Sequence, residues 1–235
     1  MSAPEPLAYA DGATVLTGYV VRPAGTPRAV IAVYPTIMNS TPTIEKKARA
    51  LAAAGYLVVV ADFYGEHVAD LGQARAKAGN LRSDVDGYRT RILAVLAAVD
   101  ALPEAAGLPR GAIGFCMGGQ AVLELARMDE PLSVVASFHG LLNTDRPAPV
   151  GGPVGPRILV CHGDADTLVP RAQVIAFWEE MDAAGADWHF HSYARVDHGF
   201  TNPIPQLGND AVAYDPSADR QSWAAMLSLF DEVFA

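Results

Sequence analysis

One short stretch constrains the fold of this chain more than any other, the glycine-rich hexapeptide Gly114-Phe115-Cys116-Met117-Gly118-Gly119. An apolar run suited to a buried strand, 110–114, precedes it, and an apolar helical pattern, 120–128, follows it. Such a strand–turn–helix junction needs glycine where neighbouring backbone passes close by. The turn would point the Cys116 sulfur out of the sheet edge, with the Met117 N–H beside it at the helix N-terminus. The same hexapeptide could instead be a tight junction around a buried thiol, because free cysteine is among the most buried residue types.

The rest of the chain alternates between strand and helix patterns. The expected strands are 7–10, 14–22, 28–34, 56–61, 132–138, 157–162 and 188–193, and Asp11-Gly12 predicts a hairpin between the first two. The expected helices are 42–54, 70–78, a longer one capped by Ser83 with apolar positions up to Val99, 169–184 and 216–234. This alternation predicts a mostly parallel sheet with helices on both faces, a three-layer αβα sandwich in one domain of 235 residues.

Composition excludes several classes of partner. A net charge of −9 argues against binding to nucleic acid or to an anionic membrane. No apolar run is long enough to span a bilayer, and residues 1–10 do not resemble a signal peptide. The two cysteines, Cys116 and Cys161, lie in or beside expected core strands, so we expect reduced thiols and a cytoplasmic location.

Two polar residues follow late strands in a way that complements Cys116. Asp166 lies in the loop after strand 157–162, and His198 lies in the loop after strand 188–193. Ligands of such sheets bind beyond the carboxyl ends of the strands, where these loops meet. The chain order nucleophile, acid, histidine is that of the α/β-hydrolase fold. The sequence therefore predicts a Cys116–His198–Asp166 catalytic triad, with Asp164 as the less favoured alternative acid.

These motifs together resemble those of one family. The chain is similar, from about residue 7 to its C-terminus, to the dienelactone hydrolase (carboxymethylenebutenolidase-like) family of α/β-hydrolases. The resemblance implies that Cys116 is the nucleophile, Asp166 the acid and His198 the base, and that the Met117 N–H is one oxyanion donor. The residues that carry it are Gly114–Gly119, His162-Gly163 with Asp166 and Val169-Pro170, Asp197-His198-Gly199-Phe200, Ala61-Asp62-Phe63-Tyr64-Gly65 and Ser137-Phe138-His139-Gly140.

Two positions depart from the pattern of that family. Its founding members carry a glutamate in the loop after the strand that ends here at Tyr34, whereas this loop has no carboxylate. Proline at position 35 has no N–H, so we expect Thr36, or failing that Ile37, as the second oxyanion donor. Members that bind a dienelactone carboxylate have an arginine four residues after the catalytic histidine, where this chain has Asn202. Arg75, Arg82 or Arg195 could replace that arginine.

A cysteine thiol has a pKa near ~8.5, and an adjacent imidazole and helix N-terminus make its thiolate accessible. We therefore expect hydrolysis of a small carboxylic ester or lactone through a thioester acyl-enzyme. The alternatives are a thioesterase or acyltransferase that uses the same triad, and an inactive hydrolase fold whose thiol senses oxidants or binds a ligand. No cofactor is expected, and no metal either, because the histidines lack H-E-x-x-H spacing and two distant cysteines cannot form a tetrathiolate.

Four aromatic residues are candidates for substrate contact. Phe63, Tyr64 and Phe138 lie at or just after strand ends, and Phe200 follows His198 by two positions. The first three could equally be ordinary core residues. Residues 201–215 follow the histidine directly and have a length at which loops are often functional, so they could form a lid or a plain connector.

Overall fold

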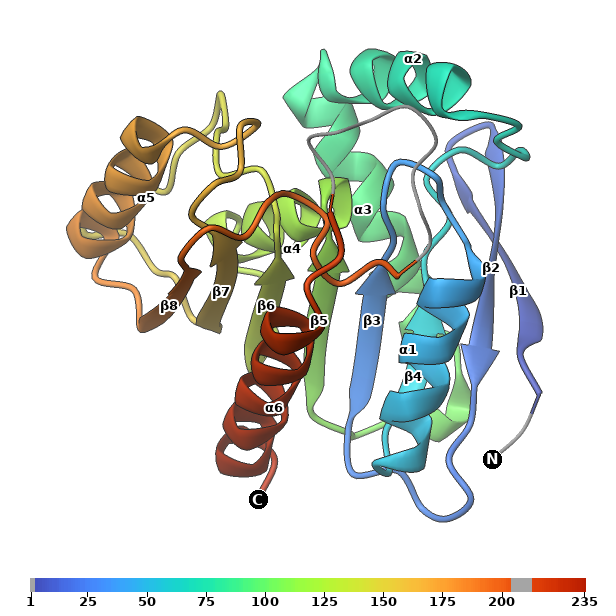
Figure 1. Cartoon of the computed structure of the whole chain (residues 1–235). Coiled ribbons are helices and arrows are strands. Elements are labelled where there is room, and N and C mark those ends of the chain that lie inside the picture. The colour runs from blue at the N-terminus through green and yellow to red at the C-terminus, as the bar shows by residue number, and fades with distance from the viewer. Residues whose placement is uncertain (1–2, 204–212) are drawn as a thin grey trace.

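The computed structural model describes residues 3–203 and 213–235, and its strands form one eight-stranded sheet of order β1-β2-β4-β3-β5-β6-β7-β8 (Figure 1). β1 pairs with β2 and β2 with β4 in antiparallel fashion, and every other pair is parallel. This confirms the predicted mostly parallel sheet. The strands are β1 Glu5–Asp11, β2 Thr14–Val21, β3 Val30–Tyr34, β4 Leu57–Val60, β5 Arg110–Phe115, β6 Val134–Phe138, β7 Arg157–Gly163 and β8 Trp188–Tyr193.

Helices cover both faces of the sheet and make two apolar layers. The helices are α1 Pro42–Ala53, α2 Leu71–Arg82, α3 Val85–Asp100, α4 Met117–Arg127, α5 Arg171–Ala184 and α6 Pro216–Val233, with a short 3-10 turn at Pro103–Ala105. Residues of α1 and α6 pack on one face, and residues of α3, α4 and α5 pack on the other. The central strands β3, β4 and β6 are buried along their whole length, which is why they are continuous apolar runs.

Helix α2 lies beyond the carboxyl ends of the parallel strands, above the sheet in Figure 1. It extends to Arg82, four residues further than expected from the sequence. Gly79 and Asn80 are weak helix formers, but a tertiary contact holds the last turn, since Arg82 Nε donates to Gln120 Oε1 of α4 at 2.6 Å. The extension places a helix over the edge of the sheet where the predicted site residues lie.

The cap of α3 differs from the expectation, and most of the segment 201–215 lies outside the described residues. The cap of α3 is Asp84, whose carboxylate accepts the Asp86 N–H at 3.1 Å, whereas Ser83 ends α2. Of the segment 201–215, residues 204–212 lie outside the described residues, so the predicted lid is not tested. Within the described ranges, no helix is both long and apolar enough to cross a membrane.

Candidate active site

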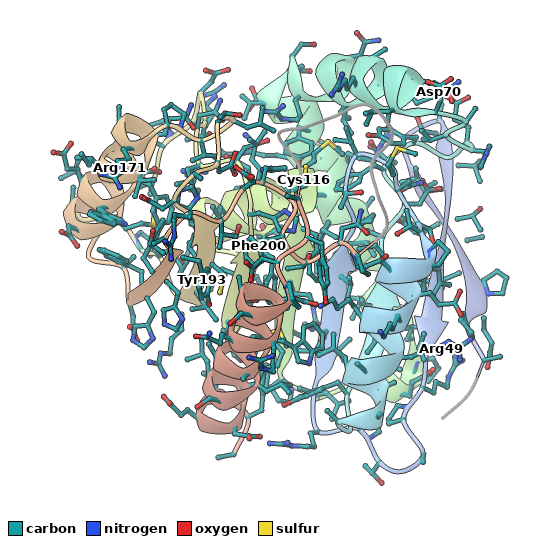
Figure 2. All side chains as sticks on the ribbon, viewed as in Figure 1. Arg49, Asp70, Cys116, Arg171, Tyr193 and Phe200 are labelled. Atoms are coloured by element: carbon teal, nitrogen blue, oxygen red, sulfur yellow. The ribbon has the colours of Figure 1, made fainter. Side chains whose placement is uncertain are left out.

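Cys116 lies at the sharp turn between β5 and α4, close to the middle of the carboxyl edge of the sheet (Figure 2). Its backbone has φ 56° and ψ −116°, a left-handed conformation that is strained for a residue with a side chain. Glycine is required on both sides of it. A Cβ on Gly114 would lie 1.8 Å from the carbonyl oxygen of Gly118, and a Cβ on Gly118 would lie 2.0 Å from the carbonyl oxygen of Tyr34. The glycines thus permit the turn, at which Cys116 is half-buried.

His198 and Asp166 form a buried hydrogen-bonded pair beside this turn. The Nδ1–H of His198 donates to Oδ2 of Asp166 at 2.8 Å, and the Leu168 N–H donates to Oδ1 at 2.8 Å. Asp164 instead points to Arg171, with an N–O distance of 2.6 Å. The partner of the histidine is therefore Asp166 and not the alternative carboxylate.

Charge couples the histidine to the thiol. Burial favours the neutral thiol of Cys116, but the charge of His198 and the N–H groups of Met117 and Ile37 outweigh burial and lower the pKa of Cys116. Burial likewise opposes protonation of His198, but the Cys116 thiolate and the Asp166 carboxylate raise the pKa of His198 to about 10. Both shifts favour a thiolate–imidazolium pair over a neutral thiol and imidazole. Nε2 of His198 has no hydrogen bond of regular geometry within the described residues, and such bonds often tighten only when substrate binds.

The backbone N–H groups of Met117 and Ile37 stabilise the thiolate of Cys116 and so help to lower its pKa. The Met117 N–H is the amide expected as one oxyanion donor, and the Ile37 N–H is the stated alternative to Thr36. Their roles as oxyanion donors stay predictions. The carbonyl oxygen of Thr36 accepts the Asn39 N–H at 2.9 Å, and its hydroxyl accepts the Met38 N–H at 3.2 Å. This tight turn presents the next amide along the chain, that of Ile37, to the thiol.

Tyrosine hydroxyls hold the carbonyl groups of the same two residues. Tyr88 donates to the Met117 carbonyl at 2.8 Å and Tyr64 donates to the Ile37 carbonyl at 3.2 Å. Tyr64 therefore reaches the site as a support of the peptide backbone. No sequence signal marks the hydroxyl of Tyr88, which lies on α3.

Asp62 fixes the loop that carries the Ile37 amide. Its carboxylate accepts the Tyr64 N–H at 2.9 Å and the side-chain amide of Asn39 at 2.7 Å, and Asn39 in turn accepts the Phe63 N–H at 3.1 Å. The loops after β3 and β4 are thus tied together on one side of the thiol.

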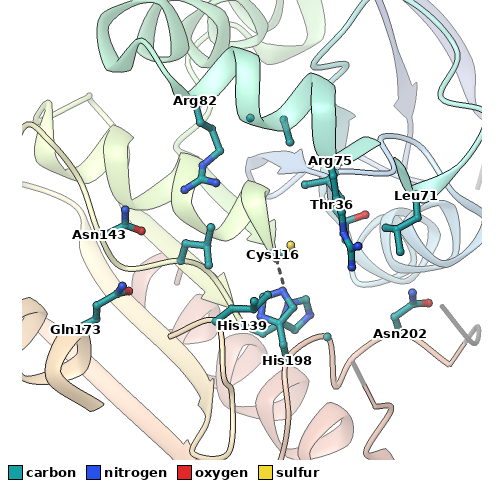
Figure 3. A pocket seen from close by; sticks show the side chains of 16 residues that line it. Thr36, Leu71, Arg75, Arg82, Cys116, His139, Asn143, Gln173, His198 and Asn202 are labelled. Atoms are coloured by element: carbon teal, nitrogen blue, oxygen red, sulfur yellow. Dashed lines mark hydrogen bonds between the residues drawn. The ribbon is translucent and has the colours of Figure 1, made fainter. Parts of the chain in front are cut away.

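A cleft of about 560 Å³ opens above the thiol (Figure 3). One face of α2 forms a wall, and Arg75 and Arg82 from that wall line the cleft on either side of Cys116. Asn202, where the family resemblance expects arginine, also lines it, whereas Arg195 does not. No carboxylate is among the described lining residues, which are Thr36, Ile37, Leu71, Arg75, Ala78, Gly79, Arg82, Cys116, His139, Leu141, Asn143, Leu168, Gln173, His198, Gly199 and Asn202.

Three of the four aromatic residues expected to contact substrate lie in the core instead. Phe63, Phe138 and Phe200 are at most 1 % exposed and are absent from the described lining of the cleft. Phe138 stacks on Phe115 beneath the sheet edge, and Phe63 packs between tyrosine rings. Apolar rings at strand ends pack into the helix layers, so the sequence pattern alone could not separate core from pocket. No group of three or more metal-ligating side chains occurs within residues 3–203 and 213–235.

A sheet of this order, with a strained turn after β5, an acid after β7 and a histidine after β8, defines an α/β-hydrolase. The sequence model of the dienelactone hydrolase family matches residues 16–234. The chain therefore belongs to the dienelactone hydrolase family, which comprises hydrolases acting on ester and lactone bonds.

Two similar structures cover nearly the whole chain, and one similar sequence covers part of it. The structure of a dienelactone hydrolase-like promiscuous phosphotriesterase from metagenomic libraries is 32% identical, covers 99% of each chain and has a TM-score of 0.91. A structure named m3DLH is 33% identical, also covers 99% of each chain and has a TM-score of 0.92. An uncharacterized protein of Caenorhabditis elegans is 37% identical over 158 residues, which is 66% of this chain and 100% of that relative.

Proposed function

We propose that this protein hydrolyses small carboxylic esters or lactones through a thioester on Cys116, with His198 as acid and base and Asp166 as its orienting carboxylate. The observation that carries the proposal is the buried His198–Asp166 hydrogen bond of 2.8 Å beside a partly exposed thiol at the floor of the cleft. A cleft of about 560 Å³ suits a small molecule. A cytoplasmic location, with which two unpaired cysteines agree, stays a prediction.

In the first half-reaction the Cys116 thiolate attacks the carbonyl carbon, and a C–S bond forms while the π electrons move to oxygen. The N–H groups of Met117 and Ile37 would receive that oxyanion, and loss of one such donor typically costs ~3–4 kcal/mol of barrier. Collapse of the intermediate breaks the C–O bond, and His198 gives its Nε2 proton to the departing alkoxide. The product of this step is an alcohol and a thioester.

In the second half-reaction water attacks the thioester carbonyl and loses a proton to His198. Collapse breaks the C–S bond, releases the carboxylic acid and restores the thiolate–imidazolium pair. Amides suit this chemistry poorly, because a thiolate leaves a tetrahedral intermediate more easily than an amine does. Esters and lactones are therefore the proposed substrates.

A trapped acyl-enzyme is the direct test. With p-nitrophenyl acetate, we expect acid-quenched protein to carry one acetyl group, and peptide mapping to locate it on Cys116. Label on another residue, or turnover with no acylated protein in a rapid quench, contradicts the proposed route. Transfer of the acetyl group to added alcohol in preference to water would identify the acyltransferase alternative, and a thiol that alkylates rapidly with no ester turnover would identify the sensor.

The pH dependence of alkylation tests the thiolate–imidazolium pair. His198 lowers the pKa of Cys116. We therefore expect the rate at which iodoacetamide labels Cys116 to reach half of its maximum at a pH below ~8.5, the ordinary cysteine midpoint. In His198→Ala the charge of the imidazolium is lost while burial and the two N–H groups remain, so the midpoint should rise. Cys161 is an internal control, because burial raises its pKa to about 12. Equal midpoints in the two proteins would contradict the pairing.

A second candidate substrate is a phosphate triester, which the similarity to a promiscuous phosphotriesterase favours. Here the Cys116 thiolate would form a bond to phosphorus, the aryloxide would leave, and water would later break the P–S bond. Release of p-nitrophenol from diethyl p-nitrophenyl phosphate by the wild type, but not by Cys116→Ala, would support this activity. A stoichiometric burst of p-nitrophenol without further turnover would show that the triester inhibits the protein and is not a substrate.

A further inference from the structure

A second histidine, His139, lies at the floor of the cleft and has no part in the proposed proton transfers. It follows β6, is 1 % exposed and has φ 40°, a left-handed conformation unusual for a residue with a side chain. Its ring meets the ring of His198 edge-on at 5.2 Å between centroids, as Figure 3 shows beside Cys116. Strained backbone at a buried polar residue beside a reactive group calls for a functional explanation.

Two hydrogen bonds define what this imidazole does. Its Nδ1 accepts the backbone N–H of Cys116 at 3.1 Å, the bond drawn dashed in Figure 3, and its Nε2 lies 2.9 Å from the hydroxyl oxygen of Thr201. Because Nδ1 accepts a hydrogen bond, the ring proton must be on Nε2, which donates to Thr201. The bonding pattern thus fixes one neutral tautomer.

The two partners of the ring belong to different parts of the candidate site. The Cys116 N–H lies inside the strained turn and is shared with the carbonyl of Phe138 at 3.0 Å. Thr201 is buried and follows His198 by three residues in the same loop. The imidazole is therefore the side-chain link between the turn that carries the thiol and the loop that carries the base.

The charges around His139 keep it neutral. Burial lowers its pKa well below the ordinary value, and the neighbouring His198 and Lys47 lower it further. Lys47 itself pairs with Asp219. A proton on Nδ1 would also set a donor against the Cys116 N–H, so protonation would break the link as well as place two imidazolium rings together.

We propose that His139 is a positioning residue, which as a neutral imidazole in a single tautomer sets the Cys116 turn against the His198 loop so that the thiol meets the base. The proposal rests on the proposed function of Cys116 and His198. It goes beyond that function because it assigns a role to a residue that contacts neither the scissile bond nor the transferred proton.

Four variants separate this role from simple packing. His139→Asn keeps an acceptor near the Cys116 N–H but cannot reach Thr201, whereas His139→Gln reaches Thr201 but leaves the Cys116 N–H without the ring. Thr201→Val keeps the shape of threonine and removes the hydroxyl, so that the Nε2–H loses its acceptor. Thr201→Ser keeps the hydroxyl and is the matched conservative control. The Thr201 pair tests the link without altering the ring, should the His139 variants fail to fold.

The readouts are the alkylation midpoint of Cys116, kcat and KM on p-nitrophenyl acetate, and the melting temperature. We expect His139→Gln and Thr201→Val to raise the alkylation midpoint and to lower kcat by roughly tenfold to a hundredfold, the range of a small misplacement of reacting groups, with KM little changed. Thr201→Ser should keep an alkylation midpoint and a kcat close to those of the wild type. Thr201→Val in the His139→Gln background should add little, because linked residues are not additive.

Unchanged alkylation midpoints and kcat in variants that only melt earlier would overturn the proposal, since His139 would then be a packing residue alone. Additive losses in the double variant would overturn the link between the two loops. The alkylation assay uses no ester substrate. Failure of the proposed function, seen as turnover by Cys116→Ala, is therefore distinguishable from failure of the role given to His139.

Discussion

Cys116→Ala should lower kcat for p-nitrophenyl acetate by roughly 10⁵–10⁶-fold, the loss expected when a nucleophile that acts as a unit with its base is removed. The other thiol of the chain, Cys161, is fully buried in β7 and is held neutral by burial. It cannot replace the missing sulfur. The residual turnover of the variant should come from the slow attack of water on an ester held against the Met117 and Ile37 amides.

The variant should fold, because alanine keeps the Cβ that the turn already accommodates. Equal melting temperatures, together with loss of iodoacetamide labelling, make the comparison clean. Cys116→Ser is the informative partner variant, since its hydroxyl is a far weaker acid than the thiol and would not form the resting ion pair with His198. Turnover of Cys116→Ala within about tenfold of the wild type would contradict the proposed nucleophile, because loss of only general-base assistance already exceeds that factor.

Asp166→Asn should lower kcat by roughly 10⁴-fold, as for other triads whose orienting acid is neutralised. The Leu168 N–H donates to one oxygen of Asp166 at 2.8 Å, so the new side chain would keep its oxygen there and turn its NH₂ group to His198. Nδ1 would then have to accept, and the proton would move to Nε2. A histidine in that tautomer cannot take a proton from thiol or water.

Asp164→Asn is the matched control, two residues away in the same loop. Asp164 pairs with Arg171, whose side chain is 77% exposed, and exposed ion pairs contribute little. We expect kcat within about twofold of the wild type for this variant, in line with the small effects of surface substitutions. A larger loss in Asp164→Asn than in Asp166→Asn, measured on the same ester, would show that the wrong carboxylate was assigned.

Much of the fold follows from local pattern. Apolar runs within the expected strands 28–34 and 56–61 predict strands buried on both faces, and glycines at 114 and 118 are needed wherever backbone must approach a turn this closely. The boundaries that were wrong, at Ser83 and at the end of α2, lie where a neighbouring cap or a contact from α4 decides between two nearly equal local choices.

Part of the candidate site could likewise be expected from the sequence, and part could not. Cys116, Asp166 and His198 each follow their own strand, and parallel strands bring their carboxyl ends to one edge, so their meeting could be expected from the sequence. Their catalytic roles stay predictions until the variants are measured. The sequence could not decide between Thr36 and Ile37, because the direction of the Ile37 amide is set by a turn that Asn39 holds through Asp62, a residue distant in sequence.

By itself the sequence determined the alternation of strands and helices along the chain, the glycine-dependent turn around Cys116 and the edge at which the three loops gather, because all of these depend on residue periodicity and on steric limits of the backbone. Only the tertiary structure decided which aromatic rings are core, which amides face the sulfur and that His139 joins the thiol turn to the Thr201 loop. Those features depend on the direction of individual side chains and N–H groups, which is set by packing between distant segments and leaves no pattern along the chain.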